Sequence, residues 1–195
     1  SLIRYVKERF DKVILIVNSS NAMELGEVNE AKTDSNLGVD AILWVGHTGN
    51  DGAAAIGRIL NGSVCPSGRT ADTYAVDFTQ DPTFTNFGSN AQNLEADGSR
   101  MDNNIYVGDT ATDYHSVEYR EGIYVGYRYY ETKGHDAGDE WYKANVVYPF
   151  GYGLSYTTFT QEFDGVAETG EITDPASIIT VRVKVTNTGD MAGKD

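Results

Sequence analysis

The sequence predicts an α/β chain, in which part of a layered domain with a mostly parallel sheet is followed by a loop-rich linker and the start of an all-β module. Two continuous apolar runs, residues 13–17 and 41–45, are typical of parallel strands buried on both faces. Helical patterns precede and follow these runs, which is the order of a layered α/β domain. A strictly alternating run at residues 178–189 instead indicates a half-exposed strand of an all-β module.

The first part of the chain alternates helical and strand patterns. Residues 2–10 place four apolar side chains on one helical face, which predicts a short amphipathic helix. The strand at 13–17 follows, and residues 22–31 could supply part of a crossover helix before the strand at 41–45. We expect the connection between the two strands to be right-handed, as parallel strands require.

A glycine-rich turn at residues 46–52 follows the second strand and leads into another helix. Asn50 or Asp51 can cap the start of this helix, and the pair Asn61–Gly62 ends it in a left-handed turn. Its predicted apolar face carries Ala55, Ile56, Ile59 and Leu60.

The middle of the chain loses this periodicity. Residues 78–115 are polar and too long for an ordinary connector, so we expect an elaborated surface loop or an insertion there. Residues 119–156 hold nine of the 13 tyrosines, and this density favours a packed interface or a sugar-facing surface. The predicted domain bounds are 1–80 for the layered domain, 81–159 for the insertion and linker, and 160–195 for the all-β module.

Composition and charge exclude several classes of function. The 195 residues include 15 Lys and Arg against 29 Asp and Glu, which gives a net charge of −14 and argues against nucleic acid as a partner. The longest apolar run, residues 13–17, is far too short to cross a membrane, and the single Cys65 excludes an internal disulfide. Since neither end carries a targeting or capping pattern, we expect a soluble piece of a longer chain, either cytoplasmic or secreted.

No motif points to a cofactor or a metal ion. The turn at 46–52 lacks the glycine and lysine spacing of a phosphate-binding loop. His47, His115 and His135 are widely separated, and residues 97–104 lack the ligand spacing of a calcium loop. We therefore expect neither a cofactor nor a metal site in this chain.

Acidic side chains are the remaining candidates for chemistry, because hydrolysis of a glycosidic bond uses two carboxylates that flank the bond. The simpler interpretation is that most of these carboxylates keep the surface soluble. The conceivable catalytic acids are Glu24, Asp51, Glu118, Glu121 and Glu131.

Five signatures of the chain resemble glycoside hydrolase family 3, the β-glucosidase and β-xylosidase family, and occur in the family's order. Residues 70–73 depart from the family's usual Leu-Pro-x-Thr, and Cys65 replaces a common Asn. Residues 181–194 are similar to the opening strand of the fibronectin type III-like domain that follows the family's C-terminal α/β sandwich domain. The signatures are residues 17–26 (VNSSNAMELG), 41–46 (AILWVG), 59–62 with 66–69 (ILNG, PSGR), 119–130 (YREGIYVGYRYY) and 148–159 (YPFGYGLSYTTF).

The resemblance implies a fold made of part of the α/β sandwich domain, a loop-rich, tyrosine-rich linker and the start of a fibronectin type III-like sandwich. It also implies a parent enzyme in which a (β/α)8 barrel supplies a nucleophilic Asp, within a Ser-Asp-Trp-like motif. The sandwich domain supplies an acid/base Glu upstream of the strand at 13–17. Neither motif occurs in these residues, so the resemblance places no catalytic residue in this chain.

The implied parent is a retaining, exo-acting β-glycosidase that acts on terminal β-linked sugars of oligosaccharides or glycosides. A β-glucosidase is the preferred interpretation, and a preference for xylosides is the alternative. The barrel of the same parent would be the partner of the tyrosine-rich segment, together with the fibronectin-like domain. Glu24, His47 and Asp51 are the candidate residues at the substrate cleft, and an ordinary role as polar turn residues is the alternative for each. A non-catalytic carbohydrate-binding or scaffold module is the competing function.

Overall fold

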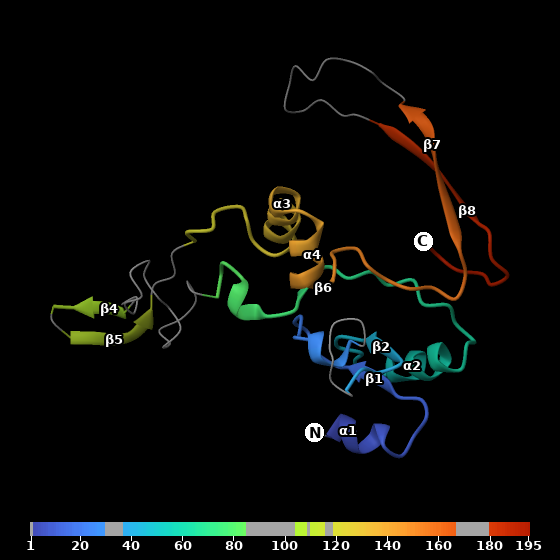
Figure 1. Cartoon of the computed structure of the whole chain (residues 1–195), viewed down its shortest axis with the longest axis horizontal. Coiled ribbons are helices and arrows are strands. Elements are labelled where there is room, and N and C mark those ends of the chain that lie inside the picture. The colour runs from blue at the N-terminus through green and yellow to red at the C-terminus, as the bar shows by residue number, and fades with distance from the viewer. Residues whose placement is uncertain (1, 30–36, 85–103, 109, 116–118, 167–179) are drawn as a thin grey trace. The chain divides into compact units, whose positions relative to one another are not determined.

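The computed structural model describes residues 2–29, 37–84, 104–108, 110–115, 119–166 and 180–195 (Figure 1). The chain divides into two compact units, which are described separately. Unit 1 comprises Ser1–His47 and Thr70–Tyr152, and unit 2 comprises Thr48–Arg69 and Gly153–Asp195. The mixture of helices and small sheets confirms the α/β class.

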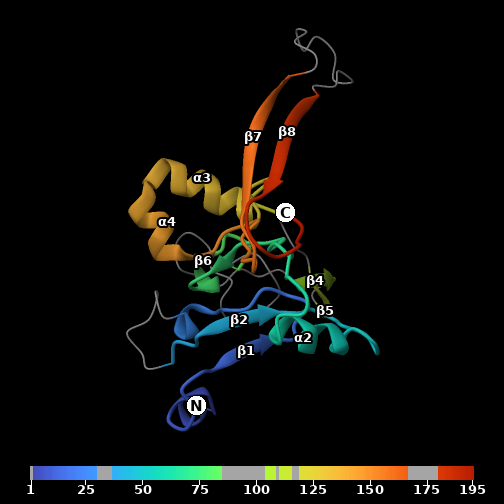
Figure 2. The ribbon, with the colours of Figure 1, turned by 90° about the vertical axis from the view of Figure 1, so that its right-hand side faces the viewer.

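Unit 1 begins with the predicted helix and the two predicted parallel strands. Helix α1 (Leu2–Lys7) precedes β1 (Ile14–Val17), which pairs in parallel with β2 (Ala41–Trp44). The two strands run side by side in Figure 2. Val17 lies opposite Trp44 in the register, so the two strands end at the same edge of the sheet.

Among the described residues, the core of unit 1 covers one face of this strand pair. Val17 is buried in a core with Leu25, Val28, Tyr74 and Val147, drawn from four different segments of unit 1. Side chains on the other face stay accessible. The exposed pair there is Ile14 and Ile16. The prediction of strands buried on both faces is therefore wrong for the described residues, because unit 1 places its core against a single face.

The predicted crossover helix is also wrong in its described part. Residues 22–25 are not helical, and only a short 3₁₀ turn, η1 (Gly26–Val28), forms before the connection continues. The backbone N–H of Val39 donates to the carbonyl of Val28, and Leu25 turns into the core. The segment is therefore held by packing and by hydrogen bonds to residues outside it, which a helical pattern cannot reveal.

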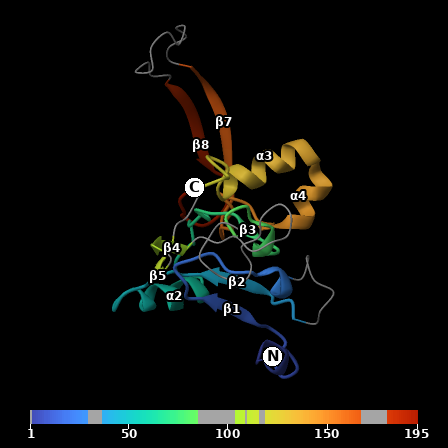
Figure 3. The same cartoon turned by 90° about the vertical axis from the view of Figure 1, so that its left-hand side faces the viewer.

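The second half of unit 1 is built on a short antiparallel sheet and two helices. Strand β3 (Tyr74–Ala75) pairs with β6 (Val146–Tyr148), as located in Figures 1 and 3. Between them lie α3 (Tyr127–Ala137) and α4 (Asp139–Asn145), so the tyrosine-rich segment forms a helical pair. Tyr130 is 1% exposed and packs with Ala75 and Val146 at the centre of a second core.

Close packing within the helical pair depends on one glycine. A Cβ atom at Gly134 would lie 2.4 Å from a ring carbon of Tyr142, so only glycine permits this approach. The Tyr142 hydroxyl in turn donates a short hydrogen bond, 2.5 Å, to Glu131. Around Tyr130, Tyr129 and Trp141 contribute edge-on and stacked aromatic contacts. Several tyrosines of residues 119–156 therefore pack inside unit 1.

The predicted loop at 78–115 contains regular structure. A 3₁₀ turn, η2 (Phe78–Gln80), opens it, and the Asp77 carboxylate caps this turn by accepting from the Thr79 N–H and hydroxyl. These bonds lower the pKa of Asp77 below its ordinary value. Strands β4 (Asn104–Val107) and β5 (Thr110–His115) form an antiparallel hairpin, so the predicted surface loop or insertion includes two regular strands in its described part.

Unit 2 contains the third predicted helix, α2 (Ala53–Leu60). The predicted caps are wrong, because Gly52 is the N-cap and no side chain caps the helix. Gly52 already has helical backbone angles, its N–H donates to the Thr48 carbonyl, and a Cβ there would lie 2.2 Å from that oxygen. At the other end the left-handed turn is confirmed by Gly62, whose φ is +77°.

A long antiparallel hairpin completes unit 2. Strand β7 (Phe159–Val166) pairs with β8 (Val181–Asn187), and Figure 3 shows the two strands side by side. One face is polar and carries an ion pair between Glu162 and Lys184. All seven side chains of β8 are exposed, which corrects the predicted half-exposed strand, because the described residues provide no second layer for its valines.

Candidate functional site

The carboxyl edge of β1 and β2 carries a polar turn and an exposed tryptophan. After β1, the Ser19 hydroxyl donates to the Asn21 carbonyl and accepts from the Asn21 N–H, which closes residues 18–21 into a tight turn. The indole Nε1 of Trp44 donates to the Ser19 carbonyl at 2.8 Å. The ends of both strands are therefore tied together at the edge where α/β sheets commonly bind ligands.

Glu24, the first candidate from the sequence, lies beyond this turn and is exposed. Its carboxylate accepts a 2.7 Å hydrogen bond from the Phe78 N–H, at the start of η2. This bond joins two segments of unit 1 that are far apart in the sequence. Glu24 thus has a positioning contact in unit 1, whatever it faces in a longer protein.

His47 and Asp51 are both exposed, and neither side chain makes a hydrogen bond or ion pair within the part of the chain that the structure describes. His47 ends unit 1, whereas Asp51 precedes α2 in unit 2. The structure therefore leaves the three candidates on exposed turns and brings no two of them together within one unit through a hydrogen bond. Their assignment to a substrate cleft stays a prediction.

The other conceivable acids have different surroundings. Glu131 accepts the Tyr142 hydroxyl, and burial of that ring together with this bond raises the pKa of Tyr142 above its ordinary value. Glu121 is partly buried near the start of the tyrosine-rich segment. Glu118 lies outside the described residues. The bond to Tyr142 gives Glu131 a role in holding α3 against α4.

Metal centres and membrane-spanning helices are two further features relevant to function. Within the described ranges, no group of three or more His, Cys, Asp or Glu side chains is arranged to hold a metal ion. Residues 97–103, which belong to the segment that lacks the spacing of a calcium loop, lie outside the described residues, whereas Asn104 is described. Among the described helices, none combines the length and the apolar character that a transmembrane span needs.

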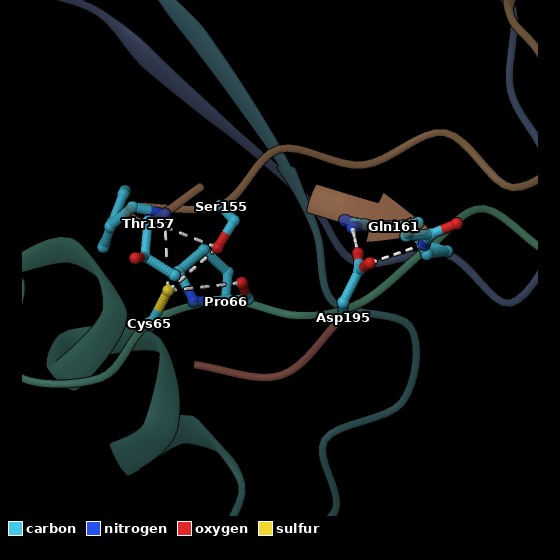
Figure 4. Close-up of polar contacts among 8 residues, drawn as sticks. Cys65, Pro66, Ser155, Thr157, Gln161 and Asp195 are labelled. Atoms are coloured by element: carbon cyan, nitrogen blue, oxygen red, sulfur yellow. Dashed lines mark hydrogen bonds and ion pairs between the residues drawn. The ribbon is translucent and has the colours of Figure 1, made fainter. Parts of the chain in front are cut away.

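Unit 2 contains a polar cluster that the sequence patterns did not predict (Figure 4). Ser155 Oγ lies 3.0 Å from Cys65 Sγ, and the Tyr156 N–H donates to the same sulfur at 3.3 Å. The bond with Ser155 is the main cause that lowers the pKa of the Cys65 thiol. No short-range motif could reveal this contact, because its two sides lie 90 residues apart.

A second part of this cluster surrounds Asp195. Its carboxylate accepts from the Gln161 amide at 2.6 Å, as Figure 4 shows. The same carboxylate pairs with the Arg69 guanidinium at 2.7 Å. The Gln161 bond, followed by Arg69, lowers the pKa of Asp195. Both contacts tie segments of unit 2 together. Within the described part of the chain, neither the thiol nor this carboxylate is paired with a histidine side chain, so the cluster has a structural role in unit 2.

The sequence of this chain is similar to those of known glycosidases. The chain matches the family model "Glycosyl hydrolase family 3 C-terminal domain" over residues 1–127. A β-glucosidase of Ruminococcus albus is 32% identical over 195 residues, which is 100% of this chain and 16% of that protein. An exo-α-(1→6)-L-arabinopyranosidase of Bifidobacterium breve is 36% identical over 143 residues, which is 73% of this chain and 14% of that protein.

A similar structure supports the same assignment. The crystal structure of a β-glucosidase from Paenibacillus barengoltzii matches with a TM-score of 0.69 and 34% identity, covering 96% of this chain and 16% of that chain. The chain thus spans about one sixth of the length of the β-glucosidases it matches. On the strength of the family match over residues 1–127, the chain belongs to glycosyl hydrolase family 3, as part of the family's C-terminal domain.

Proposed function

We propose that this chain is a section of a retaining, exo-acting β-glucosidase that releases terminal β-linked glucose from oligosaccharides or glycosides. The observation that carries the proposal is the alignment of the whole chain with a β-glucosidase at 32% identity. The arabinopyranosidase relative marks the main alternative in substrate, a different terminal pyranose.

Such a reaction needs two carboxylates about 5–5.5 Å apart, one as nucleophile and one as acid/base. The family resemblance assigns both to segments outside these 195 residues: an Asp in a (β/α)8 barrel and a Glu upstream of β1. We therefore propose that the chain contributes no catalytic residue and is inactive by itself. It serves as a support that forms part of the wall of the cleft.

Three side chains are proposed at the rim of that cleft: Glu24, His47 and Asp51. The exposure of all three supports this role, since side chains in contact with substrate must be accessible. Glu24 is the most constrained, because the Phe78 N–H fixes its carboxylate. Alanine variants of the full-length protein separate the two interpretations: a rim residue changes kcat/KM, and a polar turn residue leaves it intact.

The domain bounds are part of the same proposal. We assign residues 1–80 to the α/β sandwich domain, 81–159 to the insertion and linker that complete it, and 160–195 to the start of a fibronectin type III-like domain. The long β7–β8 hairpin, which begins at Phe159, supports the last of these bounds. Limited proteolysis of the full-length protein tests them, because cleavage is expected near residues 80 and 160.

The product of the first turnover tests the proposed reaction. Full-length protein is mixed with 4-nitrophenyl β-D-glucopyranoside, and the anomer released first is followed by proton NMR. A retaining enzyme releases β-glucose, which then mutarotates. Initial release of α-glucose would contradict the proposed mechanism, and hydrolysis of the corresponding α-L-arabinopyranoside alone would replace the proposed substrate.

A non-catalytic carbohydrate-binding module is the second candidate. Exposed aromatic side chains in unit 1, including Tyr119, Tyr124 and Phe150, favour it, because aromatic faces and hydroxyl groups suit sugars. This function requires sugar binding without hydrolysis. A full-length protein that binds cellobiose in calorimetry and releases no glucose would support the module over the enzyme.

A further inference from the structure

Trp44 is placed unusually for a large aromatic side chain. It is the last residue of β2, and its register partner Val17 is buried in the core of unit 1. Trp44 itself is 42% exposed, although it lies on the same, covered face of the strand pair as Val17. Its exposure thus comes from its position at the end of the covered face, where the core stops at the carboxyl edge.

The exposed indole is held in a fixed orientation. Its single polar atom, Nε1, donates to the Ser19 carbonyl at 2.8 Å, so the ring needs no further hydrogen-bond partner. Ser19 is itself fixed by its two hydrogen bonds with Asn21. A ring fixed in this way loses little conformational entropy when something stacks on it, which is the condition for a good binding platform.

Gly46, which follows β2, lies next to the indole ring of Trp44. Gly46 has a φ of +54°, and a Cβ at this position would touch the Cζ2 and Cη2 atoms of Trp44 at 3.5 Å. A side chain at residue 46 would therefore begin in van der Waals contact with the six-membered ring. The left-handed backbone and the missing side chain together leave the indole accessible.

The segments next to Trp44 and to its partner Ser19 carry polar side chains. The turn that receives the indole N–H exposes the side chains of Asn18, Ser20 and Asn21, and His47 follows β2 as a further exposed side chain. The side chains of Asn18, Ser20 and Asn21 carry no formal charge. An apolar plate beside amide, hydroxyl and imidazole groups suits a ligand with one apolar face and a hydroxylated edge.

We propose that Trp44 is a platform on which a pyranose ring of a β-linked saccharide stacks, with the polar side chains of the 18–21 turn near its hydroxyl groups. The C–H face of the sugar would lie on the indole. This inference rests on the proposed function and extends it, because it assigns substrate recognition to a residue of this chain. Trp44 is a binding residue in this proposal and takes no part in bond cleavage.

The other tryptophan offers a matched control. Trp141 lies in α4 and packs against Tyr129 and Tyr130 in the second core of unit 1. A Trp141→Phe substitution therefore changes an aromatic ring of the same type that is used for internal packing. Comparing Trp44→Leu, Trp44→Phe and Trp141→Phe separates the loss of a platform from a general effect of removing an indole.

The kinetic experiment uses full-length protein with cellobiose as substrate. We expect Trp44→Leu to raise KM about tenfold with kcat within about twofold, since the lost stacking acts on ground state and transition state alike. Trp44→Phe should raise KM less, because it keeps an aromatic face. Some increase in KM should remain, because the bond to Ser19 is lost. Unchanged KM for Trp44→Leu, or an equal increase for Trp141→Phe, would overturn the proposal.

A binding measurement keeps the proposal testable if the protein fails to hydrolyse cellobiose. Cellobiose is titrated against the full-length protein, and the tryptophan difference spectrum is recorded for the wild type and the same variants. The spectral change should vanish in Trp44→Leu and persist in Trp141→Phe. Absence of hydrolysis alone contradicts the proposed function, whereas absence of a Trp44-dependent signal contradicts the platform. If Trp44→Leu does not fold, Trp44→Phe decides between these outcomes.

Discussion

The strand pair β1–β2 of unit 1 and the hairpin β7–β8 of unit 2 both contain apolar strand residues, but these residues differ in burial. Val17 of β1 is buried by side chains from four other positions, whereas Val183 of β8 is 52% exposed. Local sequence patterns determine that both segments form strands. Which face becomes a core depends on segments far away in the chain.

The largest effect is expected at Tyr130, the most deeply buried large side chain of unit 1. Tyr130→Ala should lower the free energy of unfolding by about 3–5 kcal/mol, because it leaves a large cavity. Tyr130→Phe is the control. The Tyr130 hydroxyl is buried and makes no hydrogen bond within the described structure, so its removal should be neutral or stabilise by about 1 kcal/mol. Equal losses in urea denaturation for both variants would contradict the described packing.

The second-largest effect is expected at alkaline pH, which should lower the free energy of unfolding of unit 1. Burial is the first cause that raises the pKa of four tyrosines above the ordinary value of 10. Below pH 10 their full contribution to stability is present, and it is lost as the pH rises above 10, because the unfolded chain then releases protons first. These residues are Tyr74, Tyr130, Tyr142 and Tyr148.

The measurement is the urea midpoint of the wild type and of Tyr142→Phe between pH 9 and pH 11. The variant should lose less stability over this range, because one raised pKa has been removed. A Tyr152→Phe variant, at a tyrosine that is more exposed, serves as the comparison. Identical pH dependence of Tyr142→Phe and the wild type would show that Tyr142 is not buried against Glu131.

Alanine substitution of two helical glycines, one in each unit, should change the free energy of unfolding in opposite directions. Gly134→Ala in α3 should cost about 1–3 kcal/mol, since its Cβ would overlap the Tyr142 ring. Gly57→Ala in α2 should stabilise by about 0.5–1 kcal/mol, because a Cβ there meets nothing within 4 Å and alanine favours a helix. Thermal unfolding of both variants provides the test. Destabilisation by Gly57→Ala would mean that α2 packs closely against another surface in the longer protein.

The smallest effect is expected in the hairpin. Val183→Thr keeps a β-branched side chain on an exposed strand, so the free energy of unfolding should change by less than about 0.5 kcal/mol. Val17→Thr places the same hydroxyl in the core of unit 1 and should cost about 1–3 kcal/mol. A large loss for Val183→Thr in the full-length protein would identify β8 as a buried strand there.

Short-range signals predicted the elements that short-range physics controls. The helix at the N-terminus, the strands β1, β2 and β8, and the left-handed turn at Gly62 were all expected. The Asn50 or Asp51 cap failed because Gly52 takes part in a backbone turn with Thr48, so the helix starts without a side-chain cap. Backbone turns of this kind leave little trace in the types of residue.

Long-range features could not be predicted in the same way. The contact between Cys65 and Ser155 and the bond between Glu24 and Phe78 each join distant segments. No periodicity encodes such pairs. For the candidate site, residue types and turns indicated Glu24, His47 and Asp51. The exposed indole of Trp44 was hidden inside an apolar run that resembled an ordinary buried strand.

We propose that this chain is part of a glycosidase and that both catalytic carboxylates of the enzyme lie in other segments. The most direct measurement compares hydrolysis of 4-nitrophenyl β-D-glucopyranoside by the 195-residue chain and by the full-length protein at equal molar concentration. We expect release of 4-nitrophenol only from the full-length protein. Hydrolysis by the 195-residue chain alone would contradict the claim, because it would place both carboxylates among the residues described here.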